Sequence, residues 1–154
     1  MYPLIRNRRL RASESIRRLV QETTLTPDDF LVPLFVTEGK GIKEEIPSMP
    51  NYFRLSLDNL EKEVKDLWKM GLCSVLLFVK VDDKLKDNKG TEALNPNGLM
   101  QRAIKTVKNA CPQMLVMTDV ALDPFSSYGH DGIVAEGQIL NDESAEVLAE
   151  MSVS

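Results

Sequence analysis

Three aspartates follow an apolar run within the stretch TDVALDPFSSYGHDG, residues 118 to 132, which also holds the single histidine of the chain. Asp119 comes directly after the run MLVMT, and Asp123 and Asp131 follow among glycines and a proline. Carboxylates that converge repel one another, so they require a cation, an ammonium-bearing substrate or raised pKa values. The alternative is that each aspartate caps a turn beside a neighbouring proline or glycine. For all three together after one apolar run, we favour a site that handles positive charge.

A lysine stands in a comparable position at the end of another apolar run, CSVLLFVKV, residues 73 to 81. A desolvated lysine at a strand end can form a Schiff base with a carbonyl substrate. Lys80 is followed by Asp82 and Asp83, however, and a solvated charge is the simpler interpretation. We therefore assign no catalytic role to Lys80.

Alternating strands and helices are predicted to position these residues. Apolar runs indicate strands, and apolar residues three and four positions apart indicate helices. The expected strands cover residues 30–36, 73–81 and 114–122, and the expected helices cover 56–70, about 98–110 and 141 onward. This alternation is typical of an α/β fold with a parallel sheet and right-handed crossovers. Asp119 then lies at the carboxyl end of a strand, where parallel α/β folds place their chemistry.

Local composition predicts smaller features of the same fold. Pro33 indicates an edge or first strand, because proline cannot donate a hydrogen bond to a neighbouring strand. Residues 39–50 are expected to form a polar loop, and residues 132–140 a small hairpin or loop excursion. Asn141 or Asp142 is expected to cap the last helix.

The N-terminal segment, residues 1–26, is predicted to be an arm with a short helix. Six arginines against one glutamate give the first 20 residues a charge of +5, and the whole chain has −4, so the remainder carries −9. A basic arm can bind nucleic acid, but this one is nearly devoid of aromatic residues and precedes an acidic body. We therefore expect no nucleic acid, and an acidic neighbouring subunit as the partner of the arm.

Composition limits the remaining classes of protein. The 154 residues suit one compact domain, and 43% apolar and 27% charged residues are ordinary for a globular chain. Cys73 and Cys111 show no metal-binding spacing, so two reduced structural thiols are expected. No stretch approaches the ~20 apolar residues of a membrane span, and no apolar segment follows the N-terminal arginines as in a secretory signal. We therefore expect no membrane contact and a cytoplasmic location.

Three stretches of the chain resemble porphobilinogen synthase, also called 5-aminolevulinate dehydratase: RRLRASESIRRLVQETTLTPDDFLVPLFVTEG, IPSMPNYFRLSLDNL and TDVALDPFSSYGHDGIV. The resemblance runs from about residue 5 to the last residue. It implies the N-terminal part of a (β/α)8 barrel, with the arm over residues 1–26 and the first three strand–helix units over 27–154. It also implies condensation of two 5-aminolevulinate molecules to porphobilinogen in tetrapyrrole biosynthesis. Members of the family assemble as octamers, which implies that the arm wraps a neighbouring subunit.

The resemblance assigns roles to the aspartates. Zinc-using members carry three cysteines where this chain has Ala121, Asp123 and Asp131, so it resembles the aspartate-rich branch associated with magnesium or monovalent cations. The donor chemistry agrees, because carboxylate oxygen suits hard cations whereas thiolate selects zinc. Asp119 would be the catalytic and substrate-binding carboxylate, Asp123 would also bind substrate, and Asp123 with Asp131 would hold the metal. Zinc and an organic cofactor are not expected.

The family places its two catalytic lysines, and the arginines and serine that hold substrate carboxylates, in the second half of the barrel. These positions would lie beyond residue 154, so the chain alone is expected to be inactive. Two hypotheses remain open. The chain is the N-terminal part of an enzyme, or it is a non-catalytic truncated fragment or interaction module that only pairs with other chains.

Overall fold

The main sheet has five strands in the order β2-β3-β1-β4-β5. Its central part is parallel: β1 (Val32–Thr37) pairs with β4 (Ser74–Lys80) along its whole length, and β4 pairs with β5 (Leu115–Thr118). The three apolar runs therefore form three parallel strands, and the predicted α/β class with a parallel sheet is confirmed, but β5 ends at Thr118 rather than at the predicted residue 122. In this computed structural model the described residues are 3–5 and 8–154, so Arg6 of the basic arm lies outside them.

A hairpin extends the sheet beyond β1, where the sequence predicted a polar loop over residues 39–50. β2 (Lys43–Ile46) and β3 (Met49–Leu55) pair antiparallel, and β3 pairs parallel with β1 only through Phe35 and Val36. The loop prediction was wrong because β2 is an edge strand whose polar side chains face solvent. Edge strands commonly carry charged residues, so the sequence of such a strand lacks the apolar pattern from which strands are predicted.

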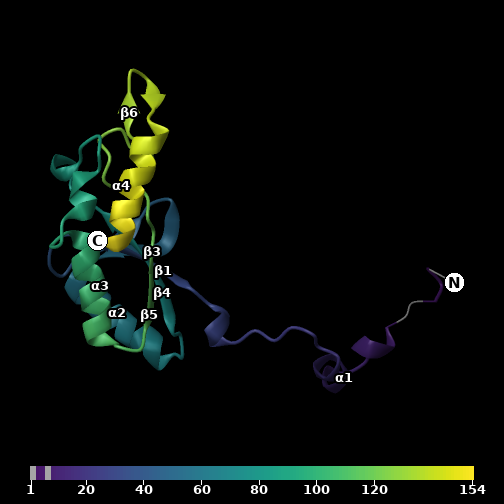
Figure 1. Cartoon of the computed structure of the whole chain (residues 1–154). Coiled ribbons are helices and arrows are strands. Elements are labelled where there is room, and N and C mark those ends of the chain that lie inside the picture. The colour runs from purple at the N-terminus through teal and green to yellow at the C-terminus, as the bar shows by residue number, and fades with distance from the viewer. Residues whose placement is uncertain (1–2, 6–7) are drawn as a thin grey trace.

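Two long helices cover one face of the sheet, as Figure 1 shows. α2 (Leu57–Lys69) and α3 (Leu99–Ala110) match the helices predicted from apolar spacing. Leu60 and Val64 of α2 and Ala103 and Val107 of α3 are fully buried in the core between helices and sheet. Burying side chains of this size contributes roughly 1.5–3 kcal/mol for each large apolar residue, which makes this layer the main source of stability.

The opposite face of the sheet is open. Side chains alternate along a strand, so Phe35 and Phe78 lie on the face away from the helices, where their rings stack with centroids 5.2 Å apart. On β5, Leu115 and Met117 point to the same side and are 58% and 47% exposed. β5 is an edge strand of the sheet, so its exposed apolar side chains extend the apolar surface of this open face to the sheet edge.

The C-terminal elements follow the aspartate-rich segment. β6 (Val134–Ala135) and β7 (Gln138–Ile139) form the small hairpin expected over residues 132–140, and α4 (Asn141–Val153) follows it. The expected capping of α4 by Asn141 or Asp142 is wrong, because Leu140 occupies the cap position and no side chain caps the helix. Within the described residues, no helix is long and apolar enough to cross a membrane.

The N-terminal arm extends away from the sheet (Figure 1). It contains the short helix α1 (Glu14–Leu19), whose cap residue Ser13 accepts a hydrogen bond from the Ile16 N–H at 3.2 Å. From residue 8 to 31 every side chain except that of Ile16 is exposed. The arm thus buries almost nothing within its own chain, and the boundary between residues 26 and 27 stays a prediction.

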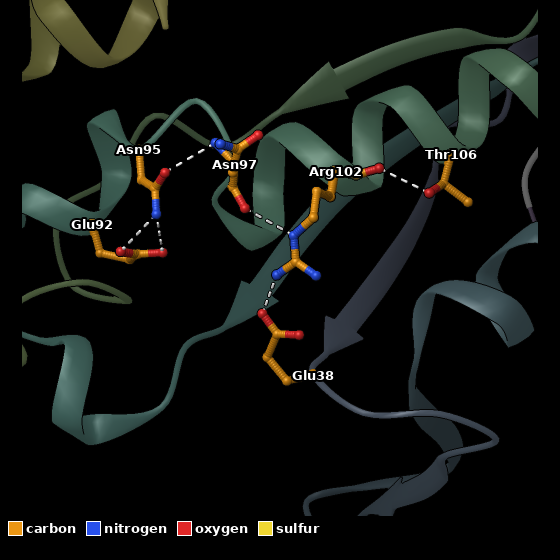
Figure 2. Close-up of polar contacts among 6 residues, drawn as sticks. All are labelled: Glu38, Glu92, Asn95, Asn97, Arg102 and Thr106. Carbon is orange, nitrogen blue, oxygen red and sulfur yellow. Dashed lines mark hydrogen bonds and ion pairs between the residues drawn. The ribbon is translucent and has the colours of Figure 1, made fainter.

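Polar side chains fix the loop after β1 to the helix after β4, as Figure 2 shows. Arg102 of α3 donates to the carbonyl of Asn97 at 2.9 Å through Nε, and its Nη2 forms an ion pair with Glu38, which directly follows β1. Thr106 donates to the Arg102 carbonyl at 2.8 Å. These contacts hold two connections in place at the carboxyl edge of the sheet.

Candidate active site

Asp119 is the first residue after β5, at the carboxyl edge of the parallel sheet. By strand alternation it points to the open face, the same side as Met117 of β5 and Lys80 at the end of β4. Asp119 and Lys80 line one pocket of about 400 Å³ at this edge. The structure therefore places the predicted catalytic aspartate where the parallel fold puts its chemistry.

The pocket combines an apolar wall with charges of both signs. The stacked rings of Phe35 and Phe78 line it. Its charged lining consists of two carboxylates and three cations, which are Asp119, Asp123, Arg54, Lys80 and Lys86. An apolar wall with a few charged groups is the usual composition of a small-molecule site.

Two of the cations are already engaged by carboxylates near the pocket. Arg54 of β3 lies 3.5 Å from Glu44. Lys86 lies 2.8 Å from Asp83, and its hydrogen bond and charge hold the pKa of that carboxyl below its usual range. Lys80 is exposed, as expected for the solvated charge inferred from the sequence.

Asp123 and Asp131 meet in the loop that follows Asp119. The Asp123 N–H donates to Asp131 Oδ1 at 3.4 Å. Partial burial raises the pKa of Asp123, and the negative charges of Asp131 and then Asp119 raise it further. The three aspartates predicted as site residues therefore influence one another, although each keeps an exposed side chain and only Asp119 and Asp123 line the pocket.

The donor set of this loop is a carboxylate pair. Among residues 3–5 and 8–154, no group of three or more histidine, cysteine, aspartate or glutamate side chains could hold a metal ion. Ala121, the third position of the set predicted from the sequence, has a methyl side chain and offers no ligand. Two carboxylates fit Mg²⁺, which commonly keeps several waters and binds through one or two carboxylates.

A neighbouring loop holds the segment 119–134, here called the aspartate loop. The N–H of Asp87, in the loop after β4, donates to the carbonyl of Phe125 at 3.2 Å, and the Ser127 N–H donates to the Asp87 carbonyl at 3.0 Å. Asp87 Oδ1 also accepts from the Lys89 N–H at 2.9 Å, which shapes its own turn. This contact was not predicted from the sequence, because the run DNKG, residues 87–90, indicates a turn but does not indicate which segment the turn contacts.

Gly90 brings the two loops into close contact. Its φ of +64° is left-handed, and a Cβ there would lie 2.6 Å from Leu122 Cδ2. Leu122 is fully buried and directly precedes Asp123. The absence of a side chain at Gly90 therefore allows Leu122 to pack beneath the aspartate loop.

Comparison with known proteins shows extensive similarity. The family model for delta-aminolevulinic acid dehydratase matches residues 4–154. The delta-aminolevulinic acid dehydratase of Chlamydia pneumoniae is 45% identical over 147 residues, covering 96% of this chain and 44% of that protein. That of Bacillus subtilis strain 168 is 45% identical over 149 residues, covering 97% and 45%. The chain thus spans less than half the length of these relatives.

A solved structure agrees with the sequence matches. The crystal structure of the Toxoplasma gondii ME49 delta-aminolevulinic acid dehydratase (porphobilinogen synthase), in complex with the reaction product porphobilinogen, superposes with a TM-score of 0.92. Identity is 44%, and the match covers 97% of this chain and 43% of that one. This likeness confirms the predicted fold class, the N-terminal part of a (β/α)8 barrel preceded by an arm.

Proposed function

The chain belongs to the delta-aminolevulinic acid dehydratase family, and from that membership we propose that it forms the N-terminal part of a porphobilinogen synthase. The complete enzyme condenses two molecules of 5-aminolevulinate to porphobilinogen with loss of two waters. This chain supplies the arm, over residues 1–26, and the first three strand–helix units of the barrel, over 27–154. The remaining barrel supplies the catalytic lysines, so this chain alone does not turn over substrate.

The charge pattern of the pocket carries the proposal. 5-Aminolevulinate has an ammonium group at one end and a carboxylate at the other. The pocket offers Asp119 and Asp123 for the ammonium and Lys80 for the carboxylate, beside Arg54 and Lys86, which also pair with Glu44 and Asp83. A molecule with both charges is therefore matched by groups of opposite sign within one pocket.

Asp119 has the central role among these groups. Its carboxylate follows the strand end and faces the open side of the sheet, which becomes the barrel interior when the barrel is complete. A carboxylate that accepts a hydrogen bond from an ammonium group forms a charge-assisted bond worth roughly 1.5–3 kcal/mol. The same carboxylate is placed to move a proton during condensation.

Asp123 and Asp131 hold either a hard cation or the amine of the second substrate. Partial burial and then the charge of Asp131 raise the pKa of Asp123, and a positive charge between the two carboxylates would relieve their repulsion. Bound Mg²⁺ or a monovalent cation would supply electrostatic stabilisation of negative charge at this edge of the sheet.

The exposed arm is proposed to bind a neighbouring subunit in a homo-oligomer. Within the described part of the chain, no ion pair involves an arginine of the arm. The acidic body of a second copy matches the charge of the arm. An octamer is the assembly that the family resemblance implies.

Fragment complementation tests the proposed function. This chain is mixed with the remaining C-terminal segment of the Bacillus subtilis relative, and porphobilinogen formation from 5-aminolevulinate is measured. Product is expected only from the mixture and not from either piece alone. A soluble complex of the two pieces that forms no product would contradict the proposal.

The exposed apolar face favours a second candidate function. Leu115 and Met117 are exposed on the edge strand β5, which suits a chain whose role is to pair with other chains. The same complementation experiment separates the two candidates. A non-catalytic interaction module would bind the C-terminal segment and leave it inactive.

A further inference from the structure

Asn88, in the loop after β4, binds the far end of the aspartate loop with its side chain. Its Nδ2 donates to the Val134 carbonyl at 2.8 Å, and its Oδ1 accepts from the Val134 N–H at 3.0 Å. One amide thus satisfies both backbone groups of Val134, as a neighbouring strand would. The two bonds are partly buried and join positions 46 residues apart in the chain.

These bonds act close to Asp131. The N–H of Ile133, two residues after Asp131, donates to Ser144 Oγ at 2.9 Å, and Val134 is held by Asn88. The backbone after Asp131 is therefore fixed from two sides, by α4 and by the loop after β4. Asp131 is joined to the first anchored residue, Ile133, through Gly132 alone.

Asn88 belongs to the four-residue segment Asp87–Gly90, which also contacts the chain around Asp123. The Asp87 N–H donates to the Phe125 carbonyl at 3.2 Å, and Gly90 packs against Leu122, so residues before and after Asp123 contact this segment. The segment Asp87–Gly90 therefore contacts the aspartate loop on each side of the Asp123–Asp131 pair. Its Asn88 is the part that reaches the Asp131 side.

We propose that Asn88 is a positioning residue that sets the approach of the Asp131 carboxylate to Asp123 through its two hydrogen bonds to Val134. The inference rests on the proposed role of this pair in holding a cation or an amine. Asn88 itself touches neither. Groups that orient ligating carboxylates typically change metal affinity by about 10–100-fold when they are removed.

The first measurement needs no metal and uses the whole chain. Backbone NMR follows the amides of Val134 and Asp123 in the wild type and in Asn88→Ala. Hydrogen exchange at Val134 should become about tenfold faster, because two hydrogen bonds are lost. The Asp123 amide should shift, because it donates to Asp131. Unchanged Asp123 resonances in Asn88→Ala would overturn the proposal.

Asn95→Ala is the matched control. Asn95 lies in the same loop, and its side chain binds Glu92 and Asn97 rather than the aspartate loop, as Figure 2 shows. This variant should leave the Val134 and Asp123 amides unchanged. Equal effects of both substitutions would mean general loosening of the loop, and would count against a positioning role for Asn88.

The second measurement uses Mn²⁺ alone as the ion and follows broadening of the aspartate-loop amides. Affinity should fall at least about tenfold in Asn88→Ala and stay unchanged in Asn95→Ala. Equal Mn²⁺ affinity in wild type and Asn88→Ala would overturn the proposal. If the wild type binds no Mn²⁺ while the metal-free amides respond as expected, the cation role fails and the positioning role stands.

Asn88→Asp covers the case in which Asn88→Ala does not fold. The aspartate keeps an acceptor for the Val134 N–H and loses the donor to the Val134 carbonyl. A positioning role predicts a shifted Asp123 amide with a Val134 amide that is still protected. An Asp123 amide that matches the wild type would refute it.

Discussion

The backbone N–H of Asp123 donates to the carboxylate of Asp131 at 3.4 Å, across eight residues of loop. This contact brings two acidic residues of the aspartate loop together. It lies beside the pocket that Asp119 and Asp123 line. Carboxylates that lie this close disfavour each other's charged form, and a bound positive charge relieves that repulsion.

Asp119→Asn separates a catalytic role from a structural one. In the complemented enzyme, turnover should fall at least about tenfold, since the loss of ~1.4 kcal/mol of transition-state stabilisation already gives that factor. The melting temperature should stay unchanged, because asparagine is nearly isosteric and the side chain is exposed. Both quantities are measured on the same preparation. A lower melting temperature with normal turnover per folded molecule would identify Asp119 as a turn cap.

Zinc removal should leave the complemented enzyme active. The aspartate loop offers carboxylates where zinc-using relatives are expected to offer thiolates, and oxygen ligands favour Mg²⁺. Porphobilinogen formation is measured after treatment with a zinc-selective chelator, with and without added Mg²⁺. Activity lost to the chelator and restored by zinc, but not by Mg²⁺, would argue decisively against the carboxylate assignment.

Lys80 should not form a Schiff base with substrate. It is exposed at the end of β4, so nothing desolvates its amine as Schiff-base chemistry requires. The chain is incubated with 5-aminolevulinate and borohydride and then analysed by mass spectrometry. An adduct on Lys80 would show that this chain carries the covalent chemistry itself.

The sequence predicted those parts of the fold that follow from periodic burial. The runs that became β1, β4 and β5 are apolar because helices cover one face and the open side is apolar too, and Val64 and Val107 mark helical faces. The β2–β3 hairpin was missed because its pairing depends on edge geometry rather than on burial. The contacts of Asp87 and Asn88 were missed for another reason. Their partners lie far along the chain, and no local pattern records such a contact.

Acid should remove the stabilising effect of Asp87. Hydrogen bonding from Thr91, together with the backbone N–H groups of Lys89 and Gly90, holds the pKa of Asp87 below its usual value. A carboxyl with a depressed folded-state pKa stabilises the protein above its unfolded pKa of about 3.9, and this stabilisation disappears as the pH falls through the folded-state value. Asp87→Asn should therefore be less stable than wild type at neutral pH.

Urea unfolding of both proteins at neutral and acid pH measures this difference. The gap in the free energy of unfolding between wild type and Asp87→Asn should narrow as the pH falls below about 3.9. A gap of the same size at both pH values would mean that the charge of Asp87 contributes nothing to stability.

Gly90→Ala should destabilise the chain more than Gly129→Ala, although both glycines have left-handed backbones with φ of +64° and +61°. Each alanine introduces backbone strain of roughly 1 kcal/mol. Gly129 has open space where a Cβ would stand, whereas at Gly90 a Cβ meets the buried Leu122 at 2.6 Å. Overpacking of a well-packed site costs about 1–3 kcal/mol more, so Gly90→Ala should lose about 2–4 kcal/mol in all. Chemical denaturation of the two variants measures this difference. Equal losses in the free energy of unfolding would show that Gly90 is needed only for its backbone conformation and not for the packing of Leu122 beneath Asp123.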